Sequence, residues 1–155
     1  MSIELDIQQA ELLSGWSLTN EVQQMLDNLL QQVQAGQSYV CAVCFVDEAS
    51  SAEMNNQYRH KHGATNILSF PYEAMPGVET NLLGDLIICS DVVQAEAITQ
   101  NKSLEQHMSH LLVHGVLHLL GYDHVTDEQA EIMEQLEIAT LANAGFPNPY
   151  LQIDH

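Results

Sequence analysis

A long run of closely spaced hydrophobic residues extends from about Ser103 to Gly121 and predicts a helix. Projected at about 100° per residue, its apolar side chains cover most of the circumference, which is typical of a buried helix. The narrow stripe that remains consists of histidines, namely His107, His110, His114 and His118. We therefore expect this helix to lie in the hydrophobic core and to carry its histidines along one face.

Shorter hydrophobic patterns on either side of this helix predict the rest of the fold. Alternating or β-branched apolar residues predict strands at 3–7, 39–46, 65–72 and 82–89. Pro71 indicates that the third of these lies near a sheet edge or bends away from the sheet. Helical spacing predicts four more helices at about 19–36, 50–63, 91–100 and 126–144, with Asp91 as the cap of the third. This order predicts a single α+β domain over residues 1–155, with about five helices packed on a roughly four-stranded mixed sheet.

Length and composition fit such a domain, since 155 residues with 46% hydrophobic content suffice for a sizeable core. The first residues form no basic and apolar leader, and no run reaches membrane-spanning length, so we expect a cytoplasmic protein without membrane contact. Cys41, Cys44 and Cys89 lie within apolar segments, which suits reduced, buried thiols. The C-x-x-C spacing of the first two is interpreted as strand core, in preference to a metal or redox site.

The charge is strongly acidic, with 21 acidic against three basic residues and a formal net charge of −18. Such a surface repels polyanions and, taken alone, argues against nucleic-acid binding. The basic residues are Arg59, Lys61 and Lys102, and the first two fall within the segment 58–62. On composition alone, this segment is best interpreted as a solvated helix end with favourable C-terminal cations.

Three histidines at the end of the apolar helix have the spacing of metal ligands. His114 and His118 lie one turn apart on the same face, and Gly121 can adopt the left-handed conformation that ends a helix. The chain can then turn back and bring His124 beside the other two. Three converging imidazoles are typical of a transition-metal site, zinc above all. A structural zinc site normally has four protein ligands, so three indicate a coordination position open to water.

The same spacing occurs in the metzincin proteases, His-Glu-x-x-His-x-x-Gly-x-x-His, with one departure here. The glutamate that acts as general base in those enzymes is replaced by Gly115, which has no side chain to take or return a proton. We therefore expect a metzincin-like metal-site helix without peptide hydrolysis by the usual route.

Together with further segments, this motif resembles the YbeY endoribonucleases, single-strand-specific bacterial enzymes that mature small-subunit ribosomal RNA and take part in ribosome quality control. Residues 114–124 are similar to the family's metal motif without a gap. The other similar segments are Tyr58-Arg59 followed by residues 65–71, residues 83–88, and the ending at 145–147. The resemblance covers most of the chain.

The resemblance implies a site, a cofactor and partners. His114, His118 and His124 would bind one zinc ion per chain, and Arg59 and His114 would be the catalytic residues. The reaction would be hydrolysis of RNA phosphodiesters in 3′-end maturation of small-subunit ribosomal RNA. The implied partners are single-stranded and ribosomal RNA, small-subunit ribosomal proteins and a ribosome-associated GTPase.

The chemistry of the residues fits this family and leaves several points open. Zinc held by neutral imidazoles activates water and polarises a phosphoryl oxygen, and the guanidinium of Arg59 can hold a phosphate. The nucleophile is either water or the 2′-OH of the RNA. Asp123 is either a turn residue or a proton acceptor, and Asp85 either orients an imidazole or makes a structural contact.

Two more histidines and two alternative functions also have to be considered. His107 and His110 are interpreted as supporting or surface residues, without a ligand role. A metalloprotease of metzincin-like geometry and a non-catalytic, zinc-stabilised ribosome-binding module are the alternative functions.

Overall fold

The computed structural model describes residues 1–73 and 75–151, and within them it contains a four-stranded mixed sheet and five α-helices. The strands are β1 (Ile3–Gln8), β2 (Tyr39–Val46), β3 (Ile67–Pro71) and β4 (Leu82–Cys89). The helices are α1 (Asn20–Gln32), α2 (Glu48–Arg59), α3 (Ser90–Thr99), α4 (Leu104–Leu119) and α5 (Asp127–Asn143), with a short 3₁₀ helix at Ala10–Leu12. The predicted α+β class, with its strands and helices, is confirmed.

The strands are arranged in the order β1-β2-β4-β3. β1, β2 and β4 are parallel, and β3 runs antiparallel to β4 at the edge of the sheet. Pro71 ends β3 on this edge. Proline has no N–H donor, and at a sheet edge no neighbouring strand needs one. The edge position predicted from Pro71 is therefore confirmed.

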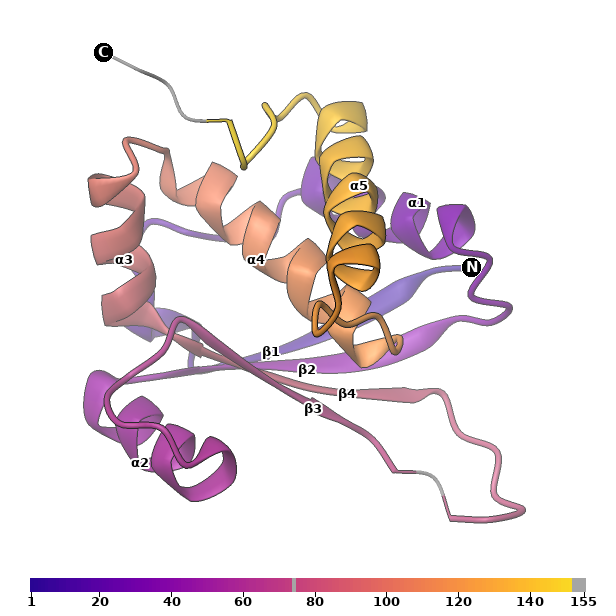
Figure 1. Ribbon diagram of the computed structural model, residues 1–155, viewed down its shortest axis with the longest axis horizontal. Coiled ribbons are helices and arrows are strands. Elements are labelled where there is room, and N and C mark those ends of the chain that lie inside the picture. Colours follow the sequence, from indigo (N-terminus) through magenta and orange to yellow (C-terminus); the bar gives the residue numbers. More distant parts are fainter. Residues whose placement is uncertain (74, 152–155) are drawn as a thin grey trace.

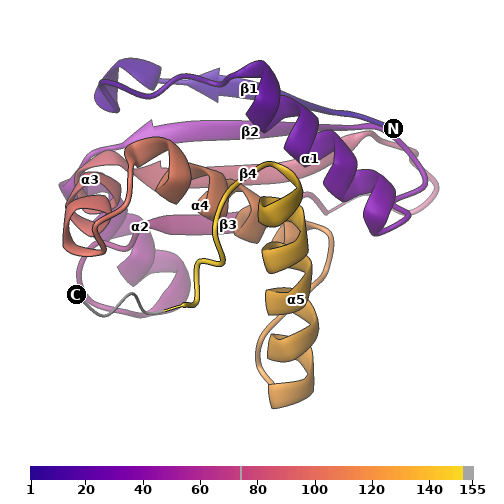
Figure 2. The same cartoon turned by 90° about the horizontal axis from the view of Figure 1, so that it is seen from above.

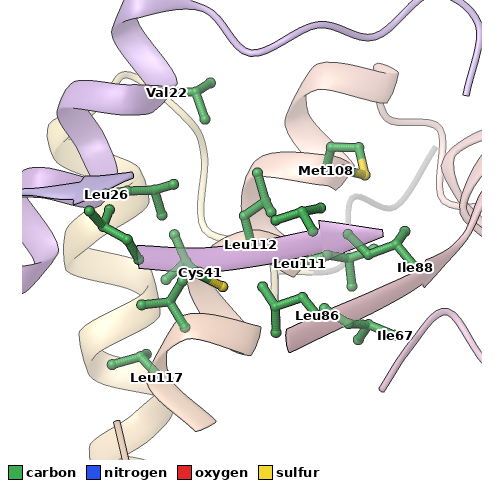
Figure 3. Close-up of a cluster of buried hydrophobic side chains, with 14 of the residues drawn as sticks. Val22, Leu26, Cys41, Ile67, Leu86, Ile88, Met108, Leu111, Leu112 and Leu117 are labelled. Carbon is green, nitrogen blue, oxygen red and sulfur yellow. The ribbon is translucent and has the colours of Figure 1, made fainter. Parts of the chain in front are cut away.

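Most of the helices pack on one face of the sheet. In Figure 1, α1, α4 and α5 lie above the strands and α2 lies below them, and Figure 2 shows α4 over the sheet between α3 and α5. Side chains from α1, α4 and the strands meet in the hydrophobic core between these layers (Figure 3). Leu112, Val116 and Leu117 of α4 are fully buried there, as expected for a helix that is apolar over most of its circumference.

Gly84 allows the edge strand β3 to approach β4 closely. It has φ +149°, and a Cβ at this position would lie 2.4 Å from the carbonyl oxygen of Phe70 and 2.8 Å from a methyl carbon of Leu119. No side chain fits between these atoms, so glycine is required for β3 and the end of α4 to pack together here.

Two helix starts differ from the sequence prediction. α2 begins at Glu48, because Asp47 accepts a 2.8 Å hydrogen bond from the backbone N–H of Ser50 and caps the helix earlier than expected. α3 begins directly after β4 with Cys89 in the cap position, so the prediction of Asp91 as the cap is wrong. Asp91 lies instead in the first turn, where its carboxylate suits the positive end of the helix dipole.

The cysteines are free and lie in or at the end of strands. Cys41 and Cys44 are three residues apart on β2, so they point to opposite faces of the sheet and share no ligand site. Burial and the nearby carboxylate of Asp85 raise the pKa of the Cys41 thiol to about 12. The interpretation of the C-x-x-C segment as a strand is confirmed, and Cys41 is buried as expected, whereas Cys44 is only half-buried.

None of the helices in residues 1–73 and 75–151 combines the length and the apolar character that a bilayer-spanning helix requires.

Candidate metal centre

Helix α4 and the turn after it position the three histidines of the predicted site. The helix begins where the Ser103 hydroxyl accepts a 3.1 Å hydrogen bond from the backbone N–H of Gln106. It ends in a Schellman motif, in which Tyr122 N–H donates to the Leu117 carbonyl and Gly121 N–H donates to the His118 carbonyl, each at 3.0 Å. Gly121 takes the left-handed conformation at φ +102°, and the chain reverses toward α4 as predicted.

The reversal brings His124 beside His114 and His118. The ring centroids lie 4.6 Å apart for His114 and His118, 5.0 Å for His118 and His124, and 5.7 Å for His114 and His124. One ring nitrogen from each histidine lies within 4.8 Å of the other two. The structure therefore brings together all three histidines that the sequence predicts as a cluster.

A buried glutamate holds the first of these histidines. Glu137 of α5 is completely buried, and its carboxylate accepts a 2.7 Å hydrogen bond from Nδ1 of His114. A second imidazole nitrogen, Nε2 of His110, lies 3.4 Å from the same carboxylate, and the hydroxyl of Tyr150 donates a short hydrogen bond to it. Three donors therefore surround one carboxylate in the core (the His110 and Tyr150 side chains also meet edge to face).

These hydrogen bonds determine the ionisation of Glu137. Burial alone would raise the pKa of this carboxyl, but the hydrogen bonds from His110, His114 and Tyr150 outweigh it and lower the pKa to about 2. The same burial and the adjacent carboxylate raise the pKa of the Tyr150 hydroxyl, so it remains a donor. Glu137 is therefore a carboxylate, which can only accept hydrogen bonds.

The ionised Glu137 selects the tautomer of His114. Since the carboxylate can only accept, the neutral, metal-binding form of His114 has its proton on Nδ1 and its lone pair on Nε2. That Nε2 atom faces Nε2 of His118 at 3.1 Å, close to the ~3.3 Å between two nitrogens on one tetrahedral zinc ion. Burial and the neighbouring His114 and His124 lower the pKa of His118, which favours its neutral, ligating form.

The donor set and its spacing fit a divalent transition metal. Imidazole nitrogens suit zinc, copper, nickel and iron, whereas magnesium and calcium prefer oxygen ligands. Within residues 1–73 and 75–151, no fourth histidine, cysteine or carboxylate joins the cluster. Three protein ligands with one position left for water or substrate are typical of a catalytic zinc site and not of a structural one.

The histidine cluster opens into a groove of about 1000 Å³. Arg59 of α2, Phe70 and Pro71 of β3, and Tyr150 line it together with the three histidines. Arg59 is exposed at the last turn of α2 and forms no ion pair with an acid of the described residues. The sequence-predicted arginine and histidines thus share one groove, and the guanidinium is available to an anion bound there.

Asp123, Asp85 and His107 lie outside the histidine cluster. Asp123 lines the groove, but its carboxylate accepts a 2.8 Å hydrogen bond from the backbone N–H of His124, as a turn residue does. Asp85 lies in the middle of β4 and does not line the groove. His107 pairs with Glu96 at 3.0 Å, outside the cluster. The carboxylate that orients an imidazole is therefore Glu137 and not Asp85.

Sequence reasoning missed Glu137, although the sequence carries a signal for it. The buried residues of α5 include Met133, Glu137 and Leu141, which are spaced by four and lie on one helix face. An acidic residue at the central position of such a face requires a buried partner, and the histidine stripe of α4 supplies it.

Gly115, which stands where metzincins have their glutamate, faces the sheet. A Cβ at this position would lie 2.7 Å from a methyl carbon of Leu86 and 2.9 Å from one of Ile67. Glycine lets α4 pack closely on β3 and β4, and any side chain here would have to displace these methyl groups.

Comparison with known proteins gives a family and a similar fold. The family model described as "Endoribonuclease YbeY" matches residues 4–145. Among solved structures, the fold is similar to the solution structure of TM1509 from Thermotoga maritima, with a TM-score of 0.56 and 22% sequence identity. The alignment covers 95% of this chain and 99% of that chain, so the likeness in fold extends over the whole domain.

Proposed function

We propose, since the chain belongs to the YbeY endoribonuclease family, that it is a zinc-dependent endoribonuclease specific for single strands. The family supports endonucleolytic action in ribosomal RNA maturation. Our proposal adds hydrolysis of phosphodiesters in 3′-end maturation of small-subunit ribosomal RNA, a part in ribosome quality control, and residues 1–155 as one metallo-hydrolase domain. The observation that carries it is the convergence of three imidazoles and one exposed guanidinium on a single groove.

His114, His118 and His124 would hold one zinc ion per chain through one ring nitrogen each. A zinc ion bound there would supply Lewis-acid polarisation of a phosphoryl oxygen and activation of the nucleophile, either water or the 2′-OH of the RNA. Glu137 keeps the Nδ1 proton on His114 and so directs the Nε2 lone pair into the cluster. This indirect action through His114 makes Glu137 a positioning residue.

Arg59 would bind the scissile phosphate. Its planar guanidinium can donate two parallel hydrogen bonds to phosphate oxygens and offset the negative charge that develops as the phosphodiester breaks. In a chain with a net charge of −18, this cation is one of three basic residues, and it lies at the groove. Its position favours a catalytic role over a solvated helix end.

The proposed partners follow from an RNA substrate and a weakly basic surface. With so few cations, the protein by itself would bind RNA weakly, so recruitment by small-subunit ribosomal proteins or a ribosome-associated GTPase would raise its local concentration at the substrate. Such partners place the proposed activity in the cytoplasm.

A peptidase of metzincin type is disfavoured by Gly115. Glycine supplies no general base at the metzincin position, and a side chain there would meet methyl groups of Leu86 and Ile67 at its first carbon.

The proposal is tested by offering metal-analysed protein single-stranded RNA, duplex RNA and a casein-type peptide substrate in parallel. We expect cleavage of single-stranded RNA alone, lost in His114→Ala and Arg59→Ala. Release of peptides that His118→Ala abolishes would support the peptidase instead. Absence of any cleavage by fully zinc-loaded protein would support a non-catalytic ribosome-binding module.

A further inference from the structure

Tyr58 is a large aromatic side chain left open to solvent beside the proposed phosphate-binding residue. It is 58% exposed, lies next to Arg59 at the end of α2 and lines the same groove as the histidine cluster. Exposure alone assigns no role to an aromatic ring, but here it leaves a ring accessible inside the groove that holds Arg59 and the histidines.

The ring is held in place without being covered. Its centroid lies 5.3 Å from that of Phe70 with an interplanar angle of 73°, an edge-to-face contact that covers at most one ring face. Phe70 belongs to β3 and lines the groove as well. The two aromatic side chains therefore form a fixed step on the wall of the groove, with a face of Tyr58 open to solvent.

Polar contacts anchor the helix that carries this ring. The Ser51 hydroxyl donates to the Thr65 carbonyl at 3.0 Å and accepts from the Thr65 backbone N–H at 3.1 Å. The Asn55 side chain donates to the Gly63 carbonyl at 2.9 Å. Both of these α2 residues are buried, so the helix is tied to the segment before β3 independently of Tyr58. The Tyr58 side chain is thus free for a ligand without being needed to hold α2.

The acidic chain has few cations for binding RNA, so uncharged contacts would add to its affinity. Lysine and arginine contacts to phosphate normally supply most of the binding energy, and only three such residues are present here. Stacking of a base on an aromatic ring contributes to affinity without charge and is possible with every base. It also requires an unpaired base with an accessible face, which a duplex hides.

We propose that Tyr58, supported by Phe70, is a nucleobase-stacking site that binds an unpaired base of the RNA next to the phosphate at Arg59. This inference rests on the proposed function and deepens it, because stacking at Tyr58 would supply both affinity and discrimination against duplex RNA. The ring does not touch the histidine cluster in any contact of the described residues, so it would act on substrate binding rather than on the chemical step.

The test compares variants of Tyr58 in steady-state cleavage of a short single-stranded RNA by the zinc-loaded protein. Tyr58→Ala and Tyr58→Leu should raise KM by about tenfold with kcat little changed, whereas Tyr58→Phe should retain the wild-type KM. Tyr72→Ala is the matched control, since Tyr72 is 46% exposed but does not line the groove. Thermal unfolding of each variant verifies that the fold is intact.

A second readout separates stacking from a general structural effect. An RNA with one abasic nucleotide at the stacked position should bind the wild-type protein about tenfold more weakly than the intact RNA, and Tyr58→Ala should not distinguish the two. The salt dependence of binding should be the same for Tyr58→Ala and wild type, because the ring carries no charge.

The outcomes are distinguishable. If Tyr58→Ala cleaves single-stranded RNA with the wild-type KM, the stacking site is wrong but the proposed nuclease activity is not. The same holds if, at every position of the abasic nucleotide, Tyr58→Ala binds the abasic RNA more weakly than the intact RNA, as the wild-type protein does. If the zinc-loaded wild-type protein neither binds nor cleaves RNA, both the proposed function and the stacking site are wrong.

Discussion

The carboxylate of Glu137 on α5 accepts a 2.7 Å hydrogen bond from Nδ1 of His114 on α4, and this bond fixes which nitrogen of His114 can bind a metal. Glu137→Gln removes the charge while retaining the shape, and it no longer requires the Nδ1–H tautomer. We predict a zinc affinity about 10–100-fold lower, measured by competition with a chromophoric chelator. Glu131→Gln, an exposed residue of the same helix, is the control. Equal zinc affinity in Glu137→Gln and wild type would show that His114 is oriented by other contacts.

Arg59 and Lys61 provide a second prediction, on catalysis and salt dependence. Arg59→Ala should lower kcat by about a hundredfold, because it removes a donor from the developing charge, and Arg59→Lys should recover only part of it. Steady-state cleavage measures both.

If Arg59 and Lys61 alone contact phosphates, log Kd should change with log salt with a slope of magnitude about 1.4, since each phosphate of a single strand contributes ~0.7. A slope several times steeper would mean that a further cationic surface binds the RNA.

Gly84 carries a prediction on stability. Gly84→Ala should lower the free energy of unfolding by about 2–4 kcal/mol, because the new methyl group meets the Phe70 carbonyl and the backbone conformation suits only glycine. Urea denaturation measures the loss. Gly63→Ala is the control, since Gly63 has φ +85° but no atom within 4 Å of the place that a methyl group would take, so it reports the conformational cost alone. Similar losses in both variants would contradict the close approach of β3 and β4.

Glu96 carries a prediction on pH. The hydrogen bond from His107 lowers its pKa below the usual 4.5, against the opposing effect of burial and with help from Asn66. A folded-state pKa below the unfolded one means that ionised Glu96 stabilises the fold above about pH 4.5 and that this contribution is lost as pH falls through the lowered pKa. Glu96→Gln should therefore be less stable than wild type near neutral pH, and the difference should shrink in acid. A difference that is constant with pH would contradict the prediction.

The cysteines allow a chemical test of the core. With its pKa raised to about 12 and its side chain buried, Cys41 should stay a thiol and react slowly with a disulfide reagent in the folded protein. Full reaction is expected in urea. Rapid reaction of Cys41 under native conditions would mean that β2 is more accessible than its burial indicates.

The elements that the sequence predicted best are those with continuous patterns. The limits of β2 and β4 agree to the residue, because unbroken apolar and β-branched runs leave one interpretation of each segment. The metal-site helix was predictable at both ends, since Ser103 is a capping residue and Gly121 a residue that accepts the left-handed conformation. The strand limits and the ends of α4 were predictable because each depends on residues that are close together in the sequence.

The contacts between distant segments were not predictable. Glu137 is one of 21 acidic residues, and although its place between Met133 and Leu141 marks it as buried, the sequence alone does not show that it reaches His114 in the folded chain. Tyr150 meets the same carboxylate from the segment after α5, where no periodic pattern constrains the backbone. Asp91 was misassigned because β4 leads into α3 without a loop, which leaves the cap to Cys89.

The central claim is that His114, His118 and His124 bind one metal ion and leave one coordination position open. X-ray absorption spectroscopy of the zinc-loaded protein, with metal analysis of the same sample, tests it directly. We expect one zinc per chain with three imidazole nitrogens at about 2.0 Å and one exchangeable oxygen. A thiolate or carboxylate of the protein in the fourth position, or zinc bound equally well by His118→Ala, would contradict it.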